Sequence, residues 1–404
     1  MRTIASARNT GLSTLLICFA IALFEGFDLQ SVGIAASRIA RHFSLSYSQV
    51  GWVFTVSSLG MLVGAAMGGR IADRLGRKTV LIISVALFGV FSIATAHVWD
   101  FHSLLAARLL TGLGLGAAMP NLIALCSEAV PAERRASAVG LMYSGLPFGA
   151  ALASLVGVVN PSDAGWKDVF YIGGLGPVVL VPALVYCLSD STEFMKARRG
   201  AATEQATKAI GTALWGEGRA GTTLSLWVGY LGALTVFYFL LNWLPSLAVG
   251  QGLSAAESAW VQVLFHTGGT IGAIAIGRLM EGRHRQLAVY GTFAGIVVSL
   301  WFLAGARSVA WMVAGGFLAG MLFCAAQSLL YSLTGLRYPV AVRGTGVGAS
   351  VAVGRIGSVV GPFAAGQLLS HGYTSANLIV ACIPLIAVAA FATSFAAAKP
   401  EASD

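Results

Sequence analysis

The sequence predicts an all-α integral membrane protein with twelve transmembrane helices in two six-helix bundles related by pseudo-symmetry. Composition is the first reason, because 57% of the residues are hydrophobic and only 10% are charged, too few to cover a soluble surface. An internal repeat is the second. The polar loop Gly69–Lys78 returns in degraded form as Gly277–Arg285, 208 positions later.

The repeat extends beyond these loops into the apolar segments on both sides. Matches at the same offset are Leu45-Ser46 with Leu253-Ser254, Trp52-Val53 with Trp260-Val261, Gly60 with Gly268, Gly64 with Gly272, Pro131 with Pro339, and Arg135 with Arg343. Duplicated hydrophobic units build many secondary transporters, which bind substrate where the two halves meet. The repeat therefore indicates a transporter.

Apolar stretches of about 20 residues, the length that crosses a bilayer core, occur twelve times along the chain. They lie near 12–36, 47–69, 79–97, 101–127, 136–159, 169–189, 223–248, 255–277, 286–305, 309–335, 344–369 and 374–397. We expect an N-terminal bundle at 1–189, a polar cytoplasmic linker at 190–222 and a C-terminal bundle at 223–404.

The distribution of basic residues predicts the orientation, because Lys and Arg accumulate in cytoplasmic loops. With both termini inside, 19 of the 25 Lys and Arg residues are cytoplasmic, while Arg38, Arg41, Lys167 and Arg307 fall in outside loops. The net charge of +9 thus reflects orientation in the inner membrane rather than nucleic-acid binding.

Motifs for enzyme chemistry are absent from the sequence. No Gly-Lys dipeptide is present to build a phosphate-binding loop, no metal-ligand spacing occurs, and the five cysteines are scattered singly. The glycines of Gly112–Gly116 fit close helix packing better than a dinucleotide loop. We expect no enzyme activity, no cofactor and no metal.

Two acids lie inside the first span, where an ionisable residue is costly and therefore a functional candidate. Glu25 and Asp28 are three residues apart and share one helix face. Desolvation and mutual repulsion both favour protonated carboxyl groups there. At the offset of the repeat, Ala233 and Val236 replace them, so the fold does not require them. The pair can carry protons, or it can simply bind an arginine of another helix.

Two cations lie inside spans, and neither has a basic equivalent in the other half. Arg108 lies at a depth close to that of the acids of the first span, so a pairing that alternates with proton binding is expected. For Arg355 the second half offers no acid in the interior of a span, and an anionic substrate can supply the charge. The alternative is that Arg355 binds helix-end carbonyl groups or extends to the interface.

Further polar and aromatic side chains within spans are candidate substrate contacts, because buried amides, imidazoles and phenols need hydrogen-bond partners. They are Tyr143, Tyr238, Asn242, His266, Gln327 and Tyr331. Each can also be a packing or interfacial residue. An apolar pocket with few polar groups suits an amphipathic aromatic acid.

The repeated loop has a mechanical interpretation. Asp73 can cap a neighbouring helix and pair with Arg77 or Arg135, forming with Gly69 and Glu128 a gate that locks the halves together when the outside is open. The alternative is that the basic residues act only as insertion anchors.

Gly69–Lys78, Arg108–Gly116 and Glu128–Arg135 together resemble the signatures of the major facilitator superfamily. Within it, the acid pair of the first span, Pro120-Asn121 and Gly354–Gly357 with Gly361-Pro362 are similar to the aromatic acid:proton symporters. Glu25 replaces the Asp usual in that group. With Leu29-Gln30 and Asn242–Pro245, this resembles the branch that transports 3-(3-hydroxyphenyl)propionate.

The resemblance implies a monomeric transporter that imports this or a related hydroxylated aromatic acid with protons, for catabolism, by alternating access. Asp28 and Glu25 would be proton sites with Arg108 as their electrostatic switch, and Arg355, Gln327 and Asn242 would contact substrate. A proton-coupled exporter of drugs or other organic compounds is the main alternative. A non-transporting sensor is a further one, although the short linker leaves little room for an output domain.

Overall fold

The computed structural model describes residues 2–131, 135–160, 162, 165–188, 214–216, 218–280, 285–306, 308–338 and 343–398. Side chains are described from residue 12 onward, except at 69–70, 73–74, 135–137, 276–280, 285, 335 and 343–345. The chain divides into two compact units, Met1–Ala201 and Ala202–Asp404. The predicted linker, 190–222, falls mostly outside the described residues.

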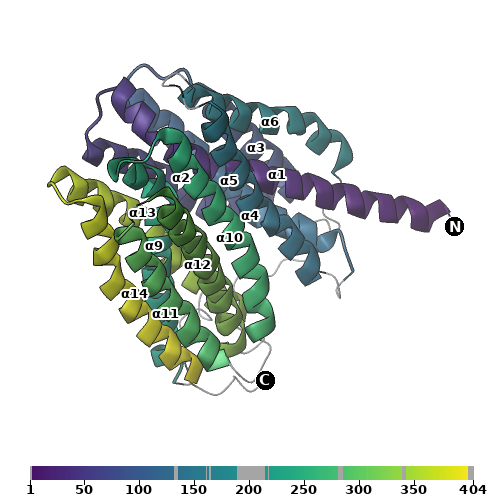
Figure 1. Cartoon of the computed structure of the whole chain (residues 1–404). Helices are drawn as coiled ribbons and strands as arrows, with labels where there is room; N and C mark the ends of the chain where they lie inside the picture. The colour runs from purple at the N-terminus through teal and green to yellow at the C-terminus, as the bar shows by residue number, and fades with distance from the viewer. Residues whose placement is uncertain are drawn as a thin grey trace. The chain divides into compact units, whose positions relative to one another are not determined.

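Helices make up almost all of the described structure (Figure 1). The first unit contains α1 (Arg2–His42), α2 (Tyr47–Leu75), α3 (Arg77–Thr95), α4 (Phe101–Glu128), α5 (Arg135–Val159) and α6 (Trp166–Cys187). The second contains α9 (Ala220–Gly250), α10 (Ala255–Met280), α11 (Arg285–Ala304), α12 (Val309–Arg337), α13 (Arg343–Ser370) and α14 (Ser375–Ala398).

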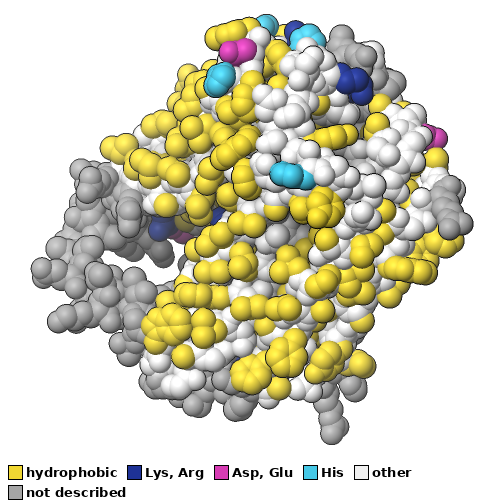
Figure 2. Space-filling model, turned by 90° about the vertical axis from the view of Figure 1, so that its left-hand side faces the viewer, with side chains coloured by type: hydrophobic (Ala, Val, Ile, Leu, Met, Phe, Trp, Pro, Cys, Tyr) yellow, Lys and Arg dark blue, Asp and Glu magenta, His cyan; other side chains and the backbone are white. Residues whose placement is uncertain are grey.

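Eleven of these helices are long and apolar enough to cross a membrane, judged on the described residues. The remaining helix, α10, carries Glu257, Gln262 and His266, which lower its hydropathy. Many large hydrophobic side chains are exposed, and on the face shown in Figure 2 they are spread widely among backbone and uncharged side chains with few charged groups, as expected for a lipid-facing protein. The predicted all-helical membrane fold is confirmed.

The two units repeat one plan. In the first unit α1 packs on α5 and α6, α2 on α4, and α3 on α4 and α6. In the second, α9 packs on α13 and α14, α10 on α12, and α11 on α12 and α14. The starts of α2, α3, α4 and α5 are each 208 positions before those of α10, α11, α12 and α13.

Equivalent residues also start equivalent helices. The Ser46 hydroxyl accepts a hydrogen bond from the Gln49 N–H at the start of α2, and the Ser254 hydroxyl accepts one from the Glu257 N–H at the start of α10. At the start of α4, hydrogen bonds from Ser103 hold the pKa of the exposed Asp100 carboxyl below its usual range.

Two arginines outside the predicted spans lie within helices: Arg38, which the sequence predicted in an outside loop, and Arg337, which follows the predicted span 309–335. Arg38 lies in α1, 3% exposed, and donates to the Asn160 and Ser162 carbonyl oxygens beyond the end of α5. Arg337 ends α12, 4% exposed, and donates to the Ala397 carbonyl at the end of α14. Both cations satisfy carbonyl groups at a helix C-terminus, which carries partial negative charge.

Glycines let the paired helices approach to backbone contact. A Cβ at Gly64 of α2 would overlap the Leu113 carbonyl of α4, and one at Gly272 of α10 would overlap the Met321 carbonyl of α12. These two contacts are equivalent under the repeat. The duplicated glycines are therefore needed for packing, as expected for small residues between membrane helices.

We expect Gly64→Ala and Gly272→Ala each to lower the thermal unfolding temperature of the purified protein. The added methyl group must separate two helices, at a cost of about 1–3 kcal/mol. Gly140→Ala and Gly348→Ala are matched controls, since nothing lies within 4 Å of a Cβ at either position. Equal unfolding temperatures for all four variants would show that close packing at Gly64 and Gly272 is not required.

Candidate functional site

A buried ion pair joins α1 to α4. Arg108 Nη2 lies 2.9 Å from Asp28 Oδ2, and Nη1 lies 3.4 Å from Oδ1, so the guanidinium grips both carboxylate oxygens. Asp28 is 0% and Arg108 1% exposed. The geometry is that of a strong, charge-assisted pair in a medium of low polarity. It brings together two residues that the sequence predicted at similar depth.

Three neighbours complete this ion-pair cluster. The Ser92 hydroxyl of α3 donates to Asp28 Oδ1 at 2.6 Å, and Arg108 Nε donates to the Ser57 hydroxyl of α2 at 3.1 Å. The Phe170 ring of α6 lies 5.8 Å from the Arg108 guanidinium carbon, in cation–π range. Sequence reasoning missed all three residues.

Uncharged residues occupy the equivalent positions of the second unit. Val236, Phe265, Leu300 and Gly316 are the equivalents of Asp28, Ser57, Ser92 and Arg108 under the repeat, and all four are buried. The helix pairs around them are nevertheless the same. The fold is therefore satisfied by apolar residues here, and the ion pair of the first unit needs a functional reason. This comparison could have identified the two serines from sequence.

Glu25, the other acid of α1, is also buried at 2% exposed. It lies one turn before Asp28, while Arg108 binds Asp28. Asp28 is thus the acid of α1 for which the structure describes an ion pair with α4.

A second polar group, in the second unit, surrounds Tyr331 of α12. The side chains of Gln327 in the same helix, Arg355 of α13 and Tyr238 of α9 lie close enough to the Tyr331 hydroxyl to interact with it electrostatically. Tyr230 packs edge-on against the Tyr331 ring, with centroids 5.8 Å apart. Four of the predicted substrate residues, Tyr331 among them, thus lie close together in the second unit.

The other three predicted substrate residues are placed differently. The Asn242 amide donates to the Tyr238 carbonyl of its own helix at 2.8 Å, and Asn242 is 8% exposed. His266 is 5% exposed beside Phe265, with ring centroids 5.4 Å apart. Tyr143 lies in α5 of the first unit and is 37% exposed.

The predicted gate is described only in part. Arg77, at the start of α3, forms an ion pair with Glu128, at the end of α4. Gly76 joins α2 to α3 with φ 93°, a backbone conformation that favours glycine. The side chains of Asp73 and Arg135, and the surroundings of Gly69, lie outside the described residues.

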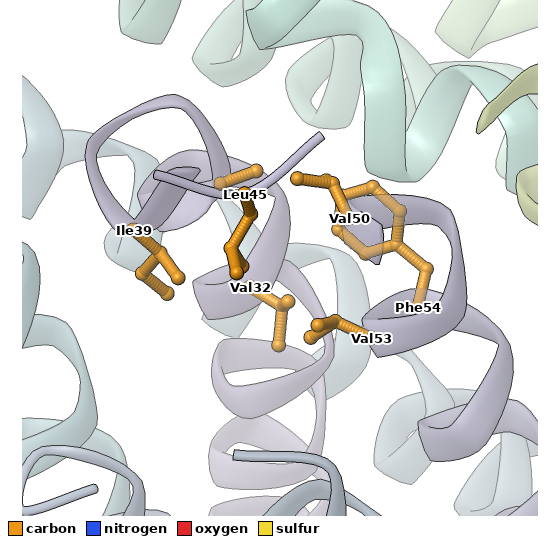
Figure 3. A pocket seen from close by; sticks show the side chains of 7 residues that line it. Val32, Ile39, Leu45, Val50, Val53 and Phe54 are labelled. Atoms are coloured by element: carbon orange, nitrogen blue, oxygen red, sulfur yellow. The ribbon is translucent and has the colours of Figure 1, made fainter. Parts of the chain in front are cut away.

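A small cavity between the last turns of α1 and the first turns of α2 does not suit a substrate. Figure 3 shows its lining, which is entirely hydrophobic: Val32, Ala36, Ile39, Leu45, Val50, Val53 and Phe54. Its volume of about 10 Å³ is about that of one water probe, and no polar group is present to hold a water. Among the described residues, no group of three His, Cys, Asp or Glu side chains could hold a metal ion.

Comparison with known proteins identifies the family. The Major Facilitator Superfamily matches residues 18–362. A 3-(3-hydroxy-phenyl)propionate transporter of Escherichia coli K12 is 44% identical over 391 residues, covering 97% of this chain and 95% of that protein. A gallate transporter of Pseudomonas putida is 34% identical, covering 89% and 85%.

Solved structures agree on the fold. The xylose transporter XylE from E. coli, in a partially occluded inward open conformation, superposes with a TM-score of 0.77 at 15% identity, covering 97% of this chain and 98% of that one. The predicted resemblance is confirmed.

We expect Asp28→Leu and Arg108→Met each to destabilise the protein by about 3–5 kcal/mol, because each leaves one buried charge unpaired. The double variant should recover much of that loss, since the equivalent positions of the second unit are apolar. Unfolding curves in detergent measure all three.

The Arg77–Glu128 pair is a matched comparison, with side chains 30% and 16% exposed. Its coupling energy in the same double-variant cycle should be smaller, about 0.2–1 kcal/mol. A double Asp28/Arg108 variant as unstable as the sum of its single variants would contradict the energetic coupling of the buried pair.

Proposed function

We propose, because the chain belongs to the Major Facilitator Superfamily, that it imports an aromatic carboxylate together with protons across the bacterial inner membrane. The best candidate substrate is 3-(3-hydroxyphenyl)propionate or a related hydroxylated aromatic acid. Relatives named for transport of such acids are up to 44% identical over nearly the whole chain. Transport then proceeds by alternating access, with the two halves rocking about a central substrate.

The observation that carries the proposal is the buried Asp28–Arg108 pair. A carboxylate in the interior of a membrane protein exchanges protons only if its neighbours change with its charge. Arg108 is such a neighbour, because it binds both oxygens of the ionised form. Glu25 provides a second carboxyl group one turn away. Proton binding biases the orientation of the carrier only through a different affinity in the two orientations.

The substrate carboxylate is assigned to Arg355. This residue is half-buried among groups that suit an aromatic acid: the guanidinium for the carboxylate, and the Gln327 amide with the Tyr238 and Tyr331 phenols for a ring hydroxyl. Asn242, His266 and Tyr143 are further candidate contacts. The excess of Lys and Arg in the even-numbered loops supports a cytoplasmic position for both termini. One chain containing both halves is expected to work as a monomer.

Uptake of radiolabelled 3-(3-hydroxyphenyl)propionate into proteoliposomes should depend on an inward proton gradient. Asp28→Asn should abolish this gradient-driven uptake, because an amide cannot bind or release the proton, while exchange of labelled for unlabelled substrate at equal pH remains. Glu25→Gln measures the share of the second acid.

Reversing the gradient distinguishes import from export. Wild-type protein that extrudes substrate against an inward gradient, and takes none up with it, would indicate the proton-coupled exporter instead. A wild type that moves neither this acid nor related aromatic acids under either gradient would refute the proposed substrate class.

Arg355→Ala should weaken substrate binding roughly 10- to 100-fold, the size expected for losing a charge-assisted hydrogen bond. Equilibrium binding to the purified protein measures this without a proton gradient. Arg41→Ala is the control, an exposed cation near the end of α1. Unchanged binding in Arg355→Ala, with the protein folded, would remove Arg355 from the site.

A further inference from the structure

We propose that Ser92 is a hydrogen-bond switch that passes the protonation state of Asp28 from α1 to the backbone of α6. This inference rests on the proposed proton coupling and assigns a positioning residue to it. Ser92 is 0% exposed in α3 and lies between two acceptors. Its Oγ is 2.6 Å from Asp28 Oδ1 and 3.4 Å from the carbonyl oxygen of Phe170.

A serine hydroxyl has a single proton, so it donates fully to only one of these acceptors at a time. While Asp28 is ionised, its carboxylate is the stronger acceptor, and 2.6 Å is the usual length of a hydroxyl–carboxylate bond. The Phe170 carbonyl then has the longer and weaker contact. The two distances therefore fit a hydroxyl that donates to the carboxylate.

Proton uptake reverses this order. A protonated Asp28 becomes a donor, and its proton can point to Ser92 Oγ, which accepts through a lone pair. The Ser92 proton then turns to the Phe170 carbonyl, so that one chain runs from the carboxyl through the hydroxyl to α6. One proton is added to Asp28, and no other group gains or loses one. The hydrogen bond between α1 and α3 is kept with its direction reversed, and a full hydrogen bond from Ser92 now also holds α3 to α6.

Packing favours α6 as the receiving element. Gly173, one turn beyond Phe170, allows this approach, because a Cβ there would lie 3.1 Å from the Phe27 ring and 3.5 Å from Ser92 Oγ. Pro177 follows in the next turn, where a missing backbone N–H weakens the helix and permits bending. The Phe170 ring also covers Arg108, so movement of this segment reaches both members of the ion pair.

The same stretch of α6 is fixed to α3 at a second point. The Tyr171 hydroxyl and His97 Nε2 are 3.1 Å apart, just beyond the end of α3. The helices that pack around Asp28 carry further charged or titratable side chains within about one turn of their contact residues. Among the described residues these are Glu25 on α1, Arg108 on α4, Tyr143 on α5, and Lys167, Asp168 and Tyr171 on α6.

The test compares Ser92→Ala, which has no hydroxyl, with Ser92→Thr, which keeps it. Ser84→Ala is the control, a buried serine in the same helix two turns away. Three quantities are measured in proteoliposomes: the external pH at which gradient-driven uptake of 3-(3-hydroxyphenyl)propionate is half-maximal, the accumulation ratio that this uptake reaches, and substrate exchange at equal pH, which needs no net proton movement.

Ser92→Ala should move the half-maximal pH upward by about one unit, because the ionised carboxylate loses a donor. Its accumulation ratio should fall at least fivefold, while exchange stays within about twofold of wild type. Ser92→Thr and Ser84→Ala should resemble wild type in all three measurements.

Two results would overturn the switch. One is a Ser92→Ala protein with the pH profile and accumulation of wild type. The other is a folded Ser92→Ala protein that loses exchange as completely as accumulation, which indicates a role in substrate passage rather than in proton coupling. Failure of the proposed function is recognised separately, because wild-type protein would then show no proton-driven uptake.

Discussion

The cost of burying charge among apolar helices determines where polar residues occur in this protein. A carboxylate or guanidinium removed from water loses several kcal/mol of solvation unless partners replace it. Asp28 and Arg108 are both almost fully buried. Each is paired with the other and forms one further hydrogen bond with a serine hydroxyl. Four helices, α1, α2, α3 and α4, must therefore hold their relative positions for the pair to persist. The close packing of α2 on α4 through glycine supports this requirement.

Duplication separates what the fold needs from what the function needs. The two units share helix starts, capping serines and glycine contacts, all of which serve packing. They differ where the polar groups lie. Asp28 and Arg108 of the first unit correspond to Val236 and Gly316, and Arg355 of the second corresponds to Pro147. The first unit thus carries the residues of the proposed proton chemistry, and the second unit carries those of the proposed anion recognition. Both units share the same helix arrangement.

Much of this was predictable from sequence, and the exceptions have physical causes. Span positions and the charged residues follow from hydropathy and the cost of buried charge. Serine in an apolar helix gives no signal in hydropathy or charge, because it usually bonds its own backbone, and only the comparison of the two repeats distinguishes Ser57 and Ser92. Ser57 donates to the Val53 carbonyl while also accepting from Arg108. Arg38 was misplaced in a loop because helix α1 continues beyond the apolar stretch, where that cation meets the end of α5.

Coupling also requires that Arg108 tolerate the loss of its partner, since protonation of Asp28 removes half of the ion pair. A lone buried guanidinium would be costly. The structure already supplies two further interactions that do not depend on the carboxylate charge: the Ser57 hydroxyl at 3.1 Å and the Phe170 ring at 5.8 Å. The Phe170 ring belongs to α6, the helix whose Phe170 carbonyl would accept the hydrogen bond from Ser92. Protonation of Asp28 would then strengthen two contacts of α6, one with Ser92 and one with Arg108. Helix α6 would therefore favour different positions when Asp28 is protonated and when it is ionised.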